Sequence, residues 1–195
     1  MHSLSVNKKE CEAFLVEAGW TQREAGRDPV FEIAFSDRKL ISLPIFKTLP
    51  QDQVVIWDHS QVWFEDYATV FHALLPTKEL QFASLVSRKN SYFQADAHPD
   101  LNFVREMTLE LKDWALSVDY DAEIKRLAEV KPYPGMIAFR HIAACVLAGK
   151  VDRLEAVRSD IAENGKTTDL HPRITLEIAS RAIELAKSKF GAPCN

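Results

Sequence analysis

The spacing of the apolar residues changes near residue 100, and this change constrains the fold more than any other feature of the chain. Before it, apolar residues come in short runs with a period of two, typical of β-strands; after it, they recur every three or four residues, typical of amphipathic helices. We therefore predict an α+β fold. An N-terminal helix and an antiparallel sheet of about four to five strands in residues 30–87 are expected to precede a bundle of about four to five helices in residues 100–190.

The same change divides the chain into two expected parts. Residues 1–98 form the part that contains the sheet, and residues 99–195 form the all-helical part. No stretch rich in serine and glycine separates them, so we expect the two parts to share an interface in one compact unit.

The first segments combine a helix with a hairpin. Residues 7–18 are predicted to be a helix that Asn7 caps and Gly19 ends, followed by a polar loop up to Pro29. Two apolar triplets then alternate with other residues: Phe31, Ile33 and Phe35, and Ile41, Leu43 and Ile45. Placing both triplets on one face requires a turn of three or five residues around Asp37-Arg38. Pro44 and Pro50 indicate that the second strand lies at an edge of the sheet.

The next segments predict a second hairpin, a short helix and a last strand. The hairpin is expected over residues 53–66, with its turn at residues 58–61, and the helix over residues 67–75. The last strand is expected over residues 80–87. Both faces of the second hairpin are apolar, which is typical of strands that are covered on two sides.

The second half of the chain is predicted to consist of consecutive helices. The first starts at Pro99-Asp100, and Asp119 or Asp121 is placed to cap the second. Residues 136–148 are apolar almost all round and are predicted to be the central buried helix, ended by Gly149. Helices over about residues 151–163 and 172–190 follow.

Composition excludes several classes of function. A formal charge of −4, with acidic and basic residues interleaved, argues against nucleic-acid binding. No apolar run approaches the ~20 residues that cross a bilayer, and residues 1–20 do not resemble a signal peptide, so we expect a cytoplasmic protein. The three cysteines, Cys11, Cys145 and Cys194, include no close pair, which argues against a disulfide framework or a zinc site. We expect no metal ion and no cofactor.

Two segments hold residue types that occur in catalytic sites. Asp58-His59-Ser60 has the residues of a charge-relayed nucleophile, but as sequence neighbours, so we prefer to interpret it as a polar hairpin turn. Asp96-Ala-His98-Pro-Asp100, which Asp169-Leu-His171-Pro172 nearly repeats, suggests an acid–base or metal site. The interpretation that we favour is that both segments start helices.

Arg140 and His141 interrupt the apolar helix. We expect them to reach a buried carboxylate from among Asp113, Asp119 and Asp121, because a buried charge is tolerated only with a partner. The pair then braces the structure, or it belongs to a functional site with shifted pKa values.

Aromatic residues cluster in the predicted second hairpin: Trp57, Trp63, Phe64 and Tyr67. If exposed, they would anchor a protein partner; if buried, they belong to the core.

Together these features favour a non-enzymatic, cytoplasmic protein that binds another protein as a chaperone, adaptor or immunity-type inhibitor. One alternative is a small hydrolase-like enzyme with a site at the junction of sheet and helices, built from His59, His98 or His141 with Asp58, Asp96 or Asp100. Another is a sensor of a small ligand in a cavity lined by Trp57, Trp63 and Trp114.

Overall fold

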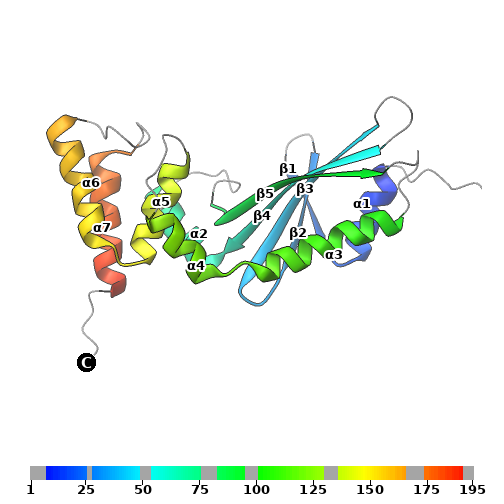
Figure 1. Ribbon diagram of the computed structural model, residues 1–195, viewed down its shortest axis with the longest axis horizontal. Coiled ribbons are helices and arrows are strands. Elements are labelled where there is room, and N and C mark those ends of the chain that lie inside the picture. The colour runs from blue at the N-terminus through cyan, green and yellow to red at the C-terminus, as the bar shows by residue number, and fades with distance from the viewer. Residues whose placement is uncertain are drawn as a thin grey trace, which may run out of the picture. The chain divides into compact units, whose positions relative to one another are not determined.

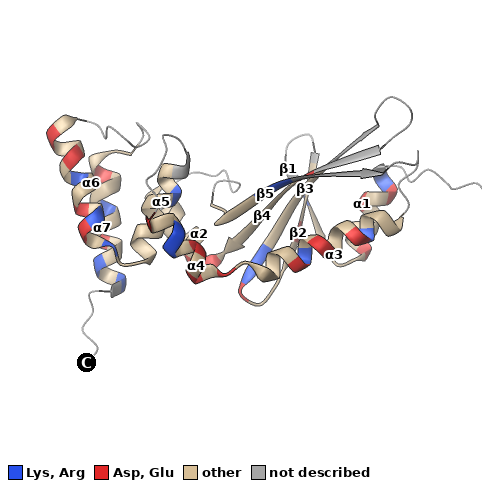
Figure 2. Cartoon of the chain, in the orientation of Figure 1, with Lys and Arg blue, Asp and Glu red and all other residues tan. Residues whose placement is uncertain are grey.

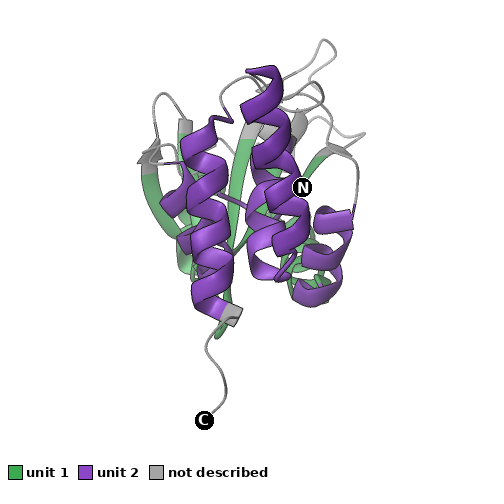
Figure 3. Ribbon diagram, turned by 90° about the vertical axis from the view of Figure 1, so that its left-hand side faces the viewer, with its two compact units in different colours: residues 1–63, 86–118 green, residues 64–85, 119–195 purple. Residues whose placement is uncertain are grey.

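The computed structural model describes residues 8–25, 28–48, 54–75, 83–94, 101–129, 136–165 and 174–190. It confirms the α+β class: an N-terminal helix and a five-stranded antiparallel sheet precede a helical region (Figure 1). The chain divides into two compact units, which Figure 3 distinguishes by colour. Unit 1 comprises residues 1–63 and 86–118, and unit 2 comprises residues 64–85 and 119–195. In this division the helix over residues 101–117 belongs to the sheet unit, and residues 64–85 belong to the helical unit.

Unit 1 contains the sheet and two helices. Its elements are α1 (Lys8–Glu17), β1 (Thr21–Ala25), β2 (Asp28–Ala34), β3 (Arg38–Thr48), β4 (Val54–Phe64), β5 (Val86–Gln94) and α3 (Leu101–Ser117). The strands lie in the order β1-β2-β3-β4-β5, so each strand neighbours the next one along the chain. Helix α1 packs against α3 and β1.

Helix α1 confirms the first predicted helix and its end at Gly19; Asn7 lies outside the described residues. Gly19 has a φ of 90°, a left-handed conformation that glycine adopts without strain. The amide of Trp20 donates to the Leu15 carbonyl and that of Gly19 to the Val16 carbonyl, at 3.0 Å each. These two bonds form a Schellman motif, and the buried Trp20 and Leu15 flank it.

The prediction of a loop before Pro29 is wrong, because this segment contains strand β1. Thr21, Gln22 and Arg23 are exposed and have no apolar alternation that would reveal a strand. Their backbones nevertheless pair with β2, in a register from Thr21 opposite Glu32 to Ala25 opposite Asp28. A polar edge strand of this kind is specified by its neighbour and by hydrogen bonding more than by its own side chains.

The turn between β2 and β3 also differs from its prediction. The Phe35 amide donates to the Arg38 carbonyl at 2.8 Å, so the turn consists of the two residues Ser36 and Asp37. Phe31 lies opposite Ser42 and Ile33 opposite Leu40, which places the even-numbered residues of β3 on the face of Phe31. The apolar pattern misled the prediction because a buried serine occupies a core position on this strand.

Two further strand predictions are wrong. β3 is the central strand rather than an edge, and it continues past Pro44. The expected second hairpin is instead one long strand, β4, which pairs with β5 from Val54 opposite Gln94 to Val62 opposite Val86. The last strand therefore starts at Val86 and not near residue 80.

Unit 2 is helical, and its predicted elements agree closely with the structure. They are α2 (Glu65–Leu74), α4 (Tyr120–Glu129), α5 (Met136–Leu147), α6 (Val151–Asn164) and α7 (Leu176–Phe190). Asp119 caps α4, since its Oδ1 accepts from the Ala122 amide at 3.0 Å. Helix α5 contacts α2, α4, α6 and α7, as expected for the central buried helix.

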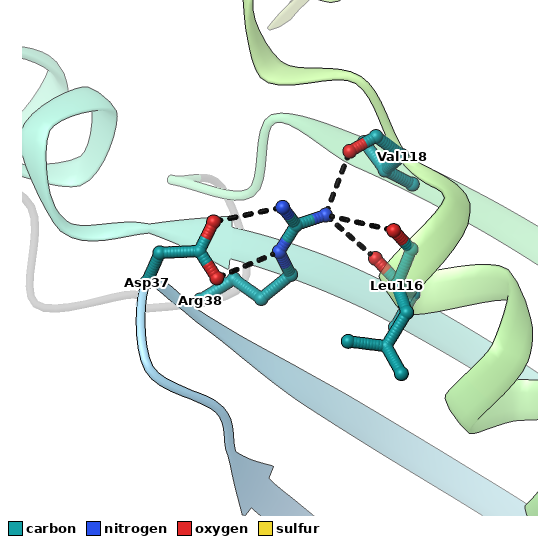
Figure 4. A network of polar contacts seen from close by, with 5 residues as sticks. Asp37, Arg38, Leu116 and Val118 are labelled. Carbon is teal, nitrogen blue, oxygen red and sulfur yellow. Dashed lines mark hydrogen bonds and ion pairs between the residues drawn. The ribbon is translucent and has the colours of Figure 1, made fainter.

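One arginine joins the β2–β3 turn to the end of α3 within unit 1 (Figure 4). The Arg38 Nη1 donates to the Ala115 carbonyl at 2.9 Å, to the Val118 carbonyl at 2.6 Å and to the Leu116 carbonyl at 3.5 Å. Its Nε and Nη2 bind both carboxylate oxygens of Asp37, at 3.0 and 2.7 Å. Carbonyls at a helix C-terminus have no partner within the helix and carry partial negative charge, so a guanidinium stabilises them.

We predict that Arg38→Gln lowers the free energy of unfolding of unit 1 by about 1–3 kcal/mol, because the carbonyls at the end of α3 lose a charged donor. All four tryptophans (Trp20, Trp57, Trp63, Trp114) belong to unit 1, so urea unfolding followed by tryptophan fluorescence reports on this unit. Arg23→Gln is the control, since Arg23 makes only an ion pair with Glu32 and is itself largely exposed. Equal losses in the two variants would contradict the role given to Arg38.

Candidate functional site

A buried carboxylate lies on the face of the sheet that packs against α3. Asp58 is in the middle of β4, and its two oxygens accept from the Ser42 hydroxyl, at 2.5 Å, and from the Ser60 hydroxyl. All three side chains are buried. Arg88, directly opposite Ser60 on β5, reaches α3: its guanidinium lies 4.6 Å from the centre of the Trp114 ring and pairs with Glu110 at 3.0 Å. This face therefore carries a polar cluster within an otherwise apolar layer.

Burial raises the pKa of Asp58 above its ordinary value of 3.8. The hydrogen bonds from Ser42 and Ser60 and the charges of Arg88 and His59 act in the opposite direction. Two hydroxyl donors are a modest set for a carboxylate removed from water, so desolvation prevails. The cluster joins β3 to β4 through Asp58, which explains why serine is acceptable at the core position of β3.

The described catalytic candidates of the sheet do not form a relay. Asp58 and Ser60 share one face of β4. His59, which lies between them in sequence, is half-buried on the other face. The interpretation of this segment as a polar turn is also wrong, because it lies inside a strand. Asp96, His98 and Asp100 lie outside the described residues, as does the segment 169–172.

The predicted aromatic anchors are core residues where they can be described. Trp63, Phe64 and Tyr67 are buried, and Phe64 packs on Tyr120 with ring centres 4.7 Å apart. The side chain of Trp57 lies outside the described residues. The second interpretation of this cluster, as part of the core, is therefore correct for three of its four members.

In unit 2, polar side chains gather at the C-terminus of α4. The Nδ1 of His141 lies 2.7 Å from the Leu127 carbonyl, which can only accept, so this nitrogen carries the proton. The Nε2 then accepts from the Cys145 thiol, 3.5 Å away. Arg153 on α6 donates to the carbonyls of Ala128 and, at 3.4 Å, of Glu129. These side chains cap the end of α4.

Neither member of the His141–Cys145 pair is prepared to ionise. Burial lowers the pKa of His141, and the Arg153 charge lowers it further. Burial raises the pKa of Cys145 to about 11 although the charges of Arg153 and Lys150 oppose this. A reactive thiol requires a depressed pKa and access to solvent, so this pair serves the architecture.

The prediction that Arg140 and His141 reach a buried carboxylate is wrong. His141 binds a backbone carbonyl, and Arg140 donates to the buried Ser84 hydroxyl at 3.1 Å. Among the described residues Arg140 makes no ion pair. The hydroxyls of Tyr67 and Tyr120, elsewhere in unit 2, are buried without a hydrogen-bond partner. Sequence spacing did not reveal the contact between Arg140 and Ser84, because the two residues lie 56 positions apart, on α5 and on the segment before β5.

A second feature that sequence reasoning missed is an apolar ridge on the outer face of α3. Leu109 and Leu116 are each 54% exposed, and they lie seven residues apart on the side opposite the buried Val104, Met107 and Leu111. Both signs of charge occur along this helix (Figure 2). The signal was present in the sequence, because these two leucines lie off the apolar stripe that defines the helix.

Two features are absent from the described part of the chain. No helix there is long enough and apolar enough to cross a membrane. Nor do three side chains of His, Cys, Asp or Glu gather there in a way that would hold a metal ion.

We predict that Asp58→Asn changes how the stability of unit 1 depends on pH. A raised pKa means that the folded state holds the Asp58 proton more tightly, so wild-type stability declines as pH rises from 3.8 through the folded value. The variant should lose this decline and match or exceed the wild type near neutral pH, by up to about 2 kcal/mol. Urea unfolding at a series of pH values, followed by tryptophan fluorescence, measures the slope. A parallel slope in the two proteins would contradict the assignment.

We predict the opposite pH response for unit 2. Because the folded pKa of His141 is lowered, the unfolded chain takes up its proton first, and wild-type stability is lost as pH falls below 6.5. His141→Gln should flatten this loss and cost about 1–2 kcal/mol above pH 7. Far-UV circular dichroism during urea unfolding measures it, with His72→Gln on α2 as the control. An unchanged acid response in His141→Gln would refute the prediction.

Comparison with curated proteins and with solved structures found no match. The model of one protein family matches residues 7–187, a span that includes parts of both compact units. The chain is therefore a member of DUF6990, a family of unknown function.

Proposed function

We propose that this chain is a non-enzymatic protein that binds another protein, and that the partner docks on the outer face of α3. The observation that carries the proposal is the ridge of Leu109 and Leu116, two large apolar side chains left more than half exposed on one side of a helix whose other side is buried. A single exposed leucine needs no explanation, but two on one helical stripe, two turns apart, give a partner helix two apolar contacts on the same face.

The residues beside the ridge define the chemistry of the partner. At 100° per residue, Arg105 and Lys112 border the ridge on one side, and Glu106 and Asp113 border it on the other. The basic border is held in place by α1: Arg105 lies over the Phe14 ring at 5.6 Å, and Lys112 donates to the Ala18 carbonyl at 3.4 Å.

This arrangement favours an amphipathic helix as the partner. Its apolar stripe would cover the two leucines, with acidic residues facing Arg105 and Lys112 and basic residues facing Glu106 and Asp113. Opposite borders of this kind also fix the direction in which a partner helix lies, because the reversed helix would bring like charges together.

We place this activity in the cytoplasm. Cys11 and Cys145 are buried free thiols without a disulfide, a state that a reducing compartment preserves. The interleaved surface charges support a role in specific recognition over broad attraction to polyanions.

The test compares the proteins that co-purify with three versions of the chain in the cells that naturally express it. We expect a partner that the wild type and Leu176→Gln retain and that the double variant Leu109→Gln/Leu116→Gln loses. Leu176 is the matched control because it is a leucine of α7 with a similar exposure, 45%. With the purified partner, the double variant should bind about 10–100-fold more weakly. In the wild type, binding would bury the exposed half of each leucine side chain, and glutamine does not gain the same apolar burial.

Folding does not confound this comparison. Glutamine is a good helix former, so exposed leucine-to-glutamine changes should alter stability by less than about 0.5 kcal/mol. The proposal fails if the double variant retains the same partner with the same affinity. A wild-type dimer that the double variant dissociates would instead make a second copy the occupant of the ridge.

A further inference from the structure

We infer that the sheet of unit 1 binds an acidic amphipathic helix of another protein on the face that points away from α3. We call this the far face and define it by three apolar residues, Val30 on β2 and Ile41 and Leu43 on β3, together with the basic side chains around them. The Asp58 cluster and α3 lie on the opposite face. The far face is therefore a different surface from the ridge on α3.

The strand register places the three apolar side chains on the far face. Phe31 lies directly opposite Ser42, and the Ser42 hydroxyl donates to Asp58 on the face that packs against α3. Paired residues of antiparallel strands point to the same side of a sheet, and side chains alternate along each strand. The neighbours of Phe31 and Ser42 along their strands, which include Ile41 and Leu43, therefore point to the far face.

The central strand thus reverses the usual distribution of polarity. A sheet that is packed on one face and solvated on the other turns its apolar side chains to the core and its polar ones to water. In β3 the polar Ser42 is 2% exposed in the core, whereas Ile41 and Leu43 on either side of it are only half-buried on the far face. Departures from the pattern that a fold prefers occur at functional sites, and an apolar surface facing outward is a place where a partner binds.

Basic side chains surround the apolar residues of the far face. Lys39 is on β3, Arg23 on β1 and Lys89 on β5, and all three side chains are exposed. Glu32 lies on the same face and pairs with Arg23 at 2.6 Å. Among the side chains described on this face, cations therefore outnumber carboxylates, although the whole chain has a formal charge of −4.

These two properties together specify the partner. Helices are a common cover for the apolar face of a sheet, and the apolar stripe of a helix would bury Ile41 and Leu43. Carboxylates beside that stripe would face Lys39 and Lys89, whereas a basic helix would be repelled. The ridge on α3 has borders of opposite sign, so the two surfaces of unit 1 select different partners.

The test measures how two synthetic helical peptides bind to the full chain, by fluorescence anisotropy of a dye attached to the peptide. Both peptides carry a stripe of leucines, which glutamates flank in one and lysines in the other. We expect saturable binding of the glutamate peptide, at least about tenfold tighter than that of the lysine peptide. Ile41→Thr/Leu43→Thr should weaken it at least about tenfold, because the apolar contact is lost. Threonine is a good strand former, so this variant should keep the sheet.

Charge reversal tests the basic side chains. Lys39→Glu/Lys89→Glu should weaken binding of the glutamate peptide at least about tenfold and strengthen binding of the lysine peptide. The matched control is Lys9→Glu/Lys125→Glu, which changes the net charge equally at exposed lysines of α1 and α4. This control should bind both peptides within about twofold of the wild type, because solvent and salt screen distant surface charges.

A variant of the ridge separates this proposal from the one for α3. Leu109→Gln/Leu116→Gln should bind the glutamate peptide as tightly as the wild type does. Loss of binding in this variant, but not in Ile41→Thr/Leu43→Thr, would place the peptide on the ridge and overturn the inference for the sheet. Equal affinity of the wild type for the two peptides, or no saturable binding of the glutamate peptide, would also overturn it. If the threonine variant does not fold, the charge-reversal variant still decides the question.

Discussion

The structure of both units depends on basic side chains that bind the carbonyls at the ends of helices. Lys112 reaches the end of α1, Arg181 donates to the Ala73 carbonyl of α2 at 3.1 Å, Arg38 caps α3 and Arg153 caps α4. Each of these bonds joins segments that are far apart in sequence and lies within a single unit. The last carbonyls of a helix have no partner inside it, so a distant cation both satisfies them and fixes where the helix ends against its neighbours.

The same principle explains why the most suggestive polar residues do not form catalytic sites. His141 and Cys145 have the atoms of a base and a nucleophile, yet the thiol donates to His141, His141 donates to the Leu127 carbonyl near the end of α4, and burial keeps both side chains neutral. Asp58 is likewise held by two serine hydroxyls beneath α3. The described buried atoms without a hydrogen-bond partner are different ones, and they include the hydroxyls of Tyr67 and Tyr120 and the Nε1 of Trp20.

Most of the helical fold could be predicted from the sequence, because each helix has an apolar stripe and several have identifiable ends, such as Asp119 and Gly149. The sheet was harder. β1 has no apolar pattern, and the core position of Ser42 depends on Asp58, a contact between two strands that periodicity cannot show. The contacts at the end of α4 could not be predicted for the same reason, because His141 and Arg153 bind backbone carbonyls that no side-chain pattern marks.

The path of the chain between the units has a consequence for synthesis on the ribosome. Unit 1 is complete once residue 118 has emerged, but by then residues 64–85 of unit 2 have also been made. The face of α2 that carries Tyr67, Phe71 and Leu74 packs against α5, so it stays uncovered until α5 has been synthesised. A nascent chain that pauses after residue 118 but before α5 is made exposes the apolar face of α2. We therefore expect chaperones to be needed most during this interval.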